Sequence, residues 1–142
     1  MKLAVLGSGI VAKTVAGKLG SIGHSVKVGT RDPKATLARN DNDMAGGPPV
    51  RTWLETAKNV SLVTLAEAAA HGDIVFNATE GRNAVAALEI AGADKLAGKV
   101  LVDISNPLDF SRGMPPSLTV ANTDSLGEQI QRALPKTKVE LW

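Results

Sequence analysis

The sequence of 142 residues contains no cysteine and no tyrosine, and its aromatic residues are two tryptophans and two phenylalanines. The lack of cysteine excludes disulfides, thiolate chemistry and zinc–sulfur sites. Because aromatic residues make up only 3% of the chain, we expect an aliphatic, alanine-rich core with closely packed elements. No apolar stretch reaches the roughly 18 residues that a membrane-spanning helix needs, so a membrane partner is not expected.

A strong charge of one sign is also missing. Lysine and arginine number 16 and aspartate and glutamate 14, a net charge of +2, and no run of like charges occurs. A nucleic-acid partner is therefore not expected. The length corresponds to a single domain over 1–142. Residues 1–6 lack the layout of a signal peptide, so we expect a cytoplasmic protein.

Short apolar segments alternate with segments of helical pattern along the chain. The sequence predicts strands at 2–6, 25–29, 60–64, 73–78, 99–104 and 137–141. It predicts helices at 10–22, 33–39, 50–58, 65–71, 83–96 and 125–134, and loops at 40–49 and 107–118. Strand–helix–strand repetition with continuously apolar strands is typical of a parallel sheet covered on both faces. We therefore predict an α/β fold with a doubly wound parallel sheet of about six strands, the Rossmann NAD(P)-binding fold.

The first predicted helix follows the glycine motif Gly7-Ser8-Gly9-Ile10-Val11-Ala12, with Val11, Val15, Leu19 and Ile22 expected on one face. Gly7 allows a tight turn after the strand, Gly9 lets a pyrophosphate approach the backbone, and Ala12 lets the helix pack on the strand. The helix N-terminus offers free N–H groups to phosphates. Gly7, Ser8, Gly9, Ile10 and Val11 are thus candidate cofactor-binding residues. The alternative is a glycine turn that binds no ligand.

The end of the second strand indicates which dinucleotide is preferred. An NAD-selective domain carries an acidic residue there for the ribose hydroxyls, and counting from the glycines places Thr30 at that position. Arg31 follows, with a planar guanidinium suited to phosphate, and Lys34 adds positive charge. These residues favour NADP. In the alternative register Asp32 would bind the ribose and Arg31 would be a solvated surface residue.

Ligands of this fold lie at the carboxyl ends of the strands. We therefore expect Ala78 and Thr79, which end the fourth strand, to lie along the nicotinamide ribose. Asn106, after the fifth strand, could orient the carboxamide or simply hydrogen-bond the turn. The two histidines are not spaced with other ligands, so no metal site is predicted. No catalytic acid–base pair is evident either, so Thr79, Ser105 and Asn106 are candidates only for positioning.

Three segments give the sequence a specific resemblance: LAVLGSGIVAKTVAGKLGSIGHSVKVGTRDP near the N-terminus, DIVFNATEG at 73–81 and VDISNPL at 102–108. They resemble the coenzyme F420-dependent NADP oxidoreductase family, and the likeness covers nearly the whole chain. The resemblance implies that NADPH lies across the first strand and that the Thr30–Arg31 pair holds its 2′-phosphate. It also implies hydride transfer between NADPH and a deazaflavin. The same domain type occurs in proteins that reduce flavins, or ferric iron through a flavin.

Members of that family continue beyond the sixth strand into elements that wall the acceptor pocket, whereas this sequence stops at Trp142. We expect a dinucleotide-binding domain without that C-terminal part. Our first hypothesis is an oxidoreductase that transfers a hydride between NADPH and coenzyme F420 or a flavin. The second is a non-catalytic NADP-binding module or subunit. A β-hydroxyacid or imine-reducing dehydrogenase ranks last, because such enzymes need a helical second domain. Residues 139–142 could form an exposed strand edge, which suggests a homodimer.

Overall fold

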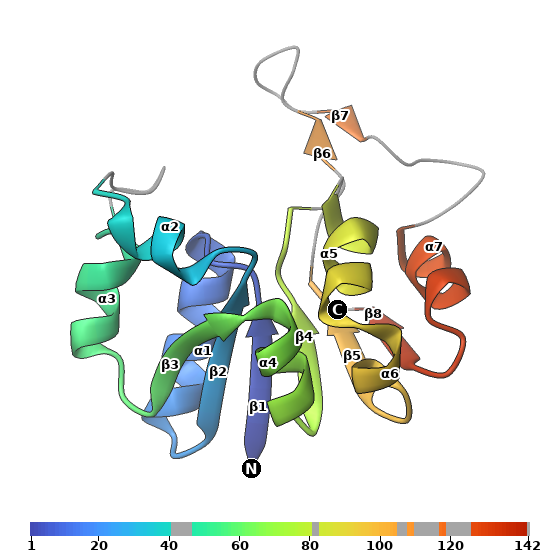
Figure 1. The fold of residues 1–142 in the computed structure, drawn as a ribbon, viewed down its shortest axis with the longest axis horizontal. Coiled ribbons are helices and arrows are strands. Elements are labelled where there is room, and N and C mark those ends of the chain that lie inside the picture. Colours follow the sequence, from blue (N-terminus) through green and yellow to red (C-terminus); the bar gives the residue numbers. More distant parts are fainter. Residues whose placement is uncertain (41–46, 81–82, 105–107, 110–116, 119–125, 142) are drawn as a thin grey trace.

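The computed structural model describes residues 1–40, 47–80, 83–104, 108–109, 117–118 and 126–141. Six parallel strands form one sheet in the order β3-β2-β1-β4-β5-β8 (Figure 1). Their bounds are β1 (Lys2–Leu6), β2 (Ser25–Thr30), β3 (Val60–Thr64), β4 (Ile74–Asn77), β5 (Val100–Asp103) and β8 (Lys138–Leu141). After β3 the chain crosses to the other side of β1, so β2 and β3 lie on one side of β1 and β4, β5 and β8 lie on the other. The predicted doubly wound Rossmann fold is confirmed.

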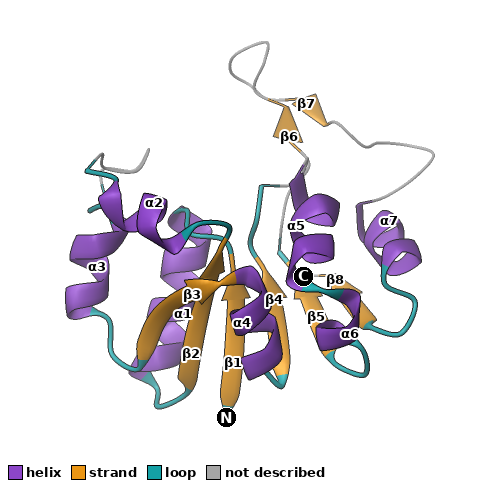
Figure 2. Cartoon of the chain, in the orientation of Figure 1, coloured by secondary structure: helices purple, strands orange, loops and turns teal. Residues whose placement is uncertain are grey.

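Helices cover both faces of this sheet (Figure 2). They are α1 (Ile10–Ser21), α2 (Pro33–Ala38), α3 (Val50–Thr56), α4 (Leu65–His71), α5 (Ala84–Ala91), α6 (Ala93–Leu96) and α7 (Leu126–Ala133). Residues of α4, α5, α6 and α7 belong to one hydrophobic cluster. Residues of α1 and α3 belong to a second cluster on the opposite face of the sheet.

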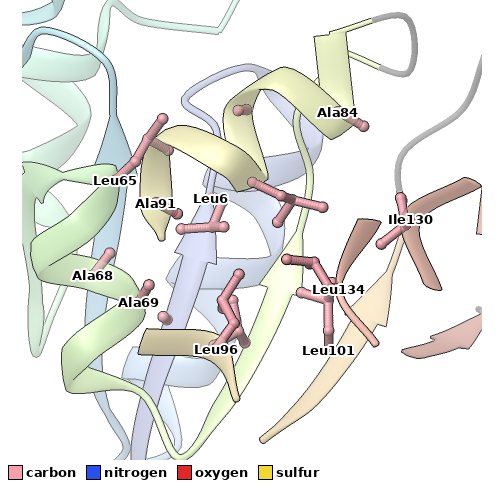
Figure 3. Packing of buried hydrophobic residues seen from close by; sticks show 14 residues of the cluster. Leu6, Leu65, Ala68, Ala69, Ala84, Ala91, Leu96, Leu101, Ile130 and Leu134 are labelled. Carbon is pink, nitrogen blue, oxygen red and sulfur yellow. The ribbon is translucent and has the colours of Figure 1, made fainter. Parts of the chain in front are cut away.

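The first cluster is built from leucines and alanines, as the shortage of aromatic residues predicts (Figure 3). Leu6, Val75 and Leu101 supply its strand side, and each is fully buried. The helices approach closely because small residues meet there. A Cβ atom on Gly29 of β2 would lie 2.9 Å from the Cβ of Ala68 in α4. The small side chains therefore set the spacing between sheet and helix.

The apolar face predicted for the first helix is confirmed at Val15 and Leu19, which pack in the second cluster, and is wrong at Val11 and Ile22. The residues of α1 that are buried are Ala12, Lys13, Ala16 and Gly20, whereas Val11 is 51% exposed and Ile22 57% exposed. The reason is close packing, since a Cβ on Gly20 would collide with the carbonyl oxygen of Lys58. A face made of small residues allows this approach and gives little periodicity of hydrophobicity.

Two further predictions need correction. The helix predicted over 83–96 is split into α5 and α6 by Gly92, whose φ of +105° favours glycine. The loop predicted over 107–118 contains two short strands, β6 (Leu108–Asp109) and β7 (Ser117–Leu118), which pair antiparallel. Within the described ranges, the model has no helix long and apolar enough to cross a membrane.

Candidate functional site

The carboxyl ends of four neighbouring strands are tied into one edge of the sheet (Figure 1). Backbone hydrogen bonds run from the N–H of Gly7 to the carbonyl of Gly29 (2.9 Å), from Ala78 to Leu6 (2.8 Å) and from Ile104 to Asn77 (3.0 Å). The segments that follow β2, β1, β4 and β5 therefore begin side by side. Open sheets of this kind bind ligands at such an edge, next to the strand where the order reverses.

The two glycines of the motif have different environments. Gly7 has a φ of +114°, and a Cβ there would lie 2.6 Å from the carbonyl oxygen of Ala78. The fold itself therefore requires Gly7. Among the described residues, a Cβ on Gly9 would meet no atom within 4 Å, and the Gly9 φ of −82° is accessible to any residue. The space over Gly9 is open, as a group approaching the backbone needs.

Helix α1 begins at this open space. Gly9 is its N-cap, no side chain caps it, and its first turn carries no acidic residue. The first N–H groups of a helix have no partner within the helix, and the helix dipole adds partial positive charge. Ser8 is half-buried, while Ile10 and Val11 are exposed beside these N–H groups. The arrangement fits an anionic group such as a diphosphate.

The end of β2 carries polar and basic side chains. The Thr30 hydroxyl lies 2.9 Å from that of Thr36 in α2, which is buried. Arg31 and Lys34 are exposed to solvent. Asp32 is the N-cap of α2, where its carboxylate accepts a hydrogen bond from a backbone N–H three residues on (3.2 Å). Asp32 thus has a structural role, while the cofactor roles of Thr30, Arg31 and Lys34 stay predictions.

The ends of β4 and β5 carry a buried polar network that the sequence analysis missed. Asn77 is fully buried and Asp103 is 5% exposed. The Asn77 amide Nδ2 donates to Asp103 Oδ1 (3.2 Å). Asn77 Oδ1 accepts from both the backbone N–H (3.3 Å) and the hydroxyl (2.7 Å) of Thr79. A polar residue at the last position of both IVFN and VLVD, in phase with buried apolar residues, was the available signal.

Lys13 is a second residue that the sequence analysis missed. It is 8% exposed, and its Nζ donates to the carbonyl oxygen of Pro48 (2.8 Å). This contact joins α1 to the start of α3, in the segment between β2 and β3. Trp53 of α3 also packs in the second cluster, where a Cβ on Gly17 of α1 would lie 3.6 Å from its ring. Trp53 therefore has a packing role between α1 and α3.

The remaining predicted site residues follow β4 and β5. Ala78 and Thr79 are half-buried beside Gly7. Ser105 and Asn106 lie outside the described residues, so their expected roles stay predictions. Among the residues that the structure describes, no group of three or more acidic, histidine or cysteine side chains could hold a metal ion.

The fold and this edge define a Rossmann-type dinucleotide-binding class of domain. The family model described as "NADP oxidoreductase coenzyme F420-dependent" matches residues 2–107. The chain belongs to this family, as the resemblance of its motifs predicted.

Three similar proteins show how the chain compares in length. A crystal structure from Arthrobacter sp. FB24, provisionally assigned as an F420-dependent NADP reductase, is 57% identical with a TM-score of 0.89. It covers 98% of this chain, which spans 60% of that chain's length. The metalloreductase STEAP3 of Rattus norvegicus is 36% identical over 114 residues, 78% of this chain and 19% of that protein. An imine reductase from Aspergillus terreus, with a TM-score of 0.62 at 14% identity, covers 99% of this chain and 39% of its own, and shares the fold alone.

Proposed function

We propose that this chain binds NADP(H) at the carboxyl ends of β1, β2 and β4 and is the cofactor domain of an oxidoreductase. The reaction is hydride transfer between NADPH and coenzyme F420, a deazaflavin, or a flavin. The observation that carries the proposal is the open space over Gly9 at the uncapped start of α1. Membership of the F420-dependent family supports it.

The diphosphate would lie over Gly9, where the N–H groups of Ile10 and Val11 begin α1. Anions bind well at such helix starts because the N–H groups point outward and the dipole is favourable. Ser8 adds a hydroxyl next to the diphosphate. The exposed side chains of Ile10 and Val11 would lie against apolar parts of the cofactor. This contact would explain why apolar side chains are exposed at this position.

The adenosine half would lie at the end of β2. Arg31 would form charge-assisted hydrogen bonds to the 2′-phosphate, with the Thr30 hydroxyl and Lys34 beside it. The contact between Thr30 and Thr36 holds the Thr30 hydroxyl in place. Asp32 Oδ1 caps α2, so the presence of an acidic residue here is accounted for by the fold without a ribose.

When bound, NADPH supplies a hydride to the acceptor. Such a transfer needs two aligned rings and the exclusion of water more than an acid or base. Ala78 and Thr79, which lie next to Gly7, would orient the nicotinamide half. We assign no catalytic residue.

The first test is titration of the protein with NADPH and with NADH, followed by nicotinamide fluorescence. We expect NADPH to bind more tightly and Arg31→Ala to weaken NADPH binding by about 10- to 100-fold, the value of a charge-assisted contact. NADH binding should change by less than about twofold. Arg132→Ala is the matched control, because it removes the same charge from exposed α7 at the far end of the sheet.

Failure to bind either dinucleotide would refute the proposal. Equal affinity for both would refute the assignment of Thr30 and Arg31 and favour Asp32 as a ribose ligand. If NADPH binds, oxidation of NADPH by coenzyme F420 and by a flavin should be followed in the same preparation.

The second candidate function is an NADP-binding module that does not turn over alone. Its support is that the open space over Gly9 and the uncapped start of α1 account for cofactor binding and not for turnover. A module of this kind would bind NADPH as above yet reduce neither acceptor. Tight binding without turnover would therefore favour the module, and turnover would refute it.

A further inference from the structure

We infer that Asp103 and Asn77 fix the Thr79 hydroxyl as a hydrogen-bond acceptor toward the nicotinamide half of NADP(H). This inference rests on the proposed function, because it names how the same site would recognise one part of the cofactor. Asp103 and Asn77 are positioning residues, and Thr79 is the residue that would touch the ligand.

Two constraints set the orientation of the Asn77 amide. The backbone N–H of Thr79 can only donate, so the atom of Asn77 that it meets at 3.3 Å must be the carbonyl oxygen. Asp103 Oδ1 faces the other end of the amide and accepts from its nitrogen at 3.2 Å. Both requirements are met by one orientation. The amide is buried, so water does not compete for it.

The orientation of Asn77 then decides the polarity of Thr79. The Thr79 hydroxyl lies 2.7 Å from Asn77 Oδ1, which is already an acceptor. The hydroxyl must therefore donate its single proton to Asn77, and what remains on its oxygen is acceptor capacity. Thr79 is half-buried at the open edge of the sheet, next to Gly7. The ligand group that fits it is a donor.

The nicotinamide half of NADPH offers two kinds of donor, the ribose hydroxyls and the carboxamide N–H₂. Either would satisfy the Thr79 oxygen. A cofactor fragment without this half, such as 2′,5′-ADP, offers neither. The inference therefore predicts a loss of affinity confined to ligands that carry the nicotinamide riboside.

The experiment measures the Kd of NADPH and of 2′,5′-ADP for wild type, Thr79→Val, Thr79→Ser and Asp103→Asn. We expect Thr79→Val to weaken NADPH binding about fivefold to tenfold, as for one neutral hydrogen bond. The binding of 2′,5′-ADP should stay within about twofold, and Thr79→Ser should restore NADPH binding because it keeps the hydroxyl. Thr56→Val is the matched control, since Thr56 is an exposed threonine at the end of α3.

Asp103→Asn tests the positioning role. It relaxes one of the two constraints on Asn77, so NADPH binding should weaken about threefold, again with 2′,5′-ADP unchanged. Urea denaturation of each variant shows whether it is folded, and intact binding of 2′,5′-ADP shows that its site is formed. A merely structural role would lower both affinities together.

The source of the donor is identified with the 3-acetylpyridine analogue of NADPH, which lacks the carboxamide N–H₂. If the ribose is the donor, Thr79→Val weakens binding of the analogue by the same factor as binding of NADPH. If the carboxamide is the donor, Thr79→Val leaves the Kd of the analogue unchanged. Unchanged NADPH affinity in Thr79→Val overturns the inference, whereas absence of NADPH and 2′,5′-ADP binding to wild type overturns the proposed function itself.

Discussion

The ends of β2 and β4 differ in how their polar groups are held. At the end of β2, Arg31 and Lys34 are exposed. At the end of β4, Asn77 is fully buried and bonded on both sides, to Asp103 and to Thr79. Exposed charges attract a phosphate over distance but are screened and mobile. A buried network is rigid and sensitive to each of its members. One edge of the sheet thus combines exposed positive charge with a buried polar network.

The largest expected effect comes from the glycine between these two strand ends. Gly7→Ala would place a Cβ against the carbonyl of Ala78 at a φ of +114°. We expect it to lower the free energy of unfolding by roughly 2–5 kcal/mol, from backbone strain and overpacking together. Urea denaturation followed by circular dichroism measures this.

Gly9→Ala is the matched control for that variant. No atom of the part of the chain that the structure describes lies within 4 Å of the added Cβ, so the free energy of unfolding should stay within about 0.5 kcal/mol of wild type. NADPH binding should nevertheless be lost, because the methyl group occupies the space proposed for the diphosphate. Equal loss of stability in both variants would mean that the two glycines have the same structural role.

Salt concentration should affect the binding contributions of the two strand ends differently. Because Arg31 and Lys34 are exposed, raising KCl from 50 to 500 mM should reduce the preference for NADPH over NADH by about threefold or more. The ratio of NADPH affinities between wild type and Thr79→Val should not change, because the network at β4 is buried and its lost bond is neutral. Fluorescence titrations at both salt concentrations provide the comparison. A salt-independent preference for NADPH would contradict recognition by exposed charge.

The smallest effect is expected at the cap of α2. Asp32→Ala should lower the free energy of unfolding by about 1 kcal/mol, whereas Asp32→Asn, which keeps a capping oxygen, should change it by about 0.3 kcal/mol or less. Neither substitution should alter the Kd of NADPH by more than about twofold. If Asp32→Asn instead weakens NADH binding strongly in the titration, Asp32 is a ribose ligand.

Local patterns were sufficient to predict the order of strands and helices. The runs LAVL and VLVDI, apolar at nearly every position, indicated buried parallel strands, and the glycines after the first of them indicated the turn into α1. The prediction of one helix over 83–96 was wrong, because the helix is interrupted at Gly92. A single glycine in an apolar run does not reveal whether its φ is positive.

The candidate site divides in the same way. The glycine turn and the basic strand end have local signatures, so Gly7, Gly9, Thr30 and Arg31 could be chosen as candidate residues from the sequence. The pairing of Asn77 with Asp103, and of Lys13 with the carbonyl of Pro48, joins residues 26 and 35 positions apart. No periodicity or spacing marks such contacts.

The sequence by itself determined the fold class, the family and the edge of the sheet where a ligand would lie, because these depend on strand pattern and on residues adjacent in the chain. Only the tertiary structure decided that Gly7 serves the fold while Gly9 faces open space. It also decided that α1 packs through its small residues and that Asn77 is oriented by a neighbouring strand. These properties depend on which distant atoms come within van der Waals or hydrogen-bond distance, and that is settled when the sheet assembles.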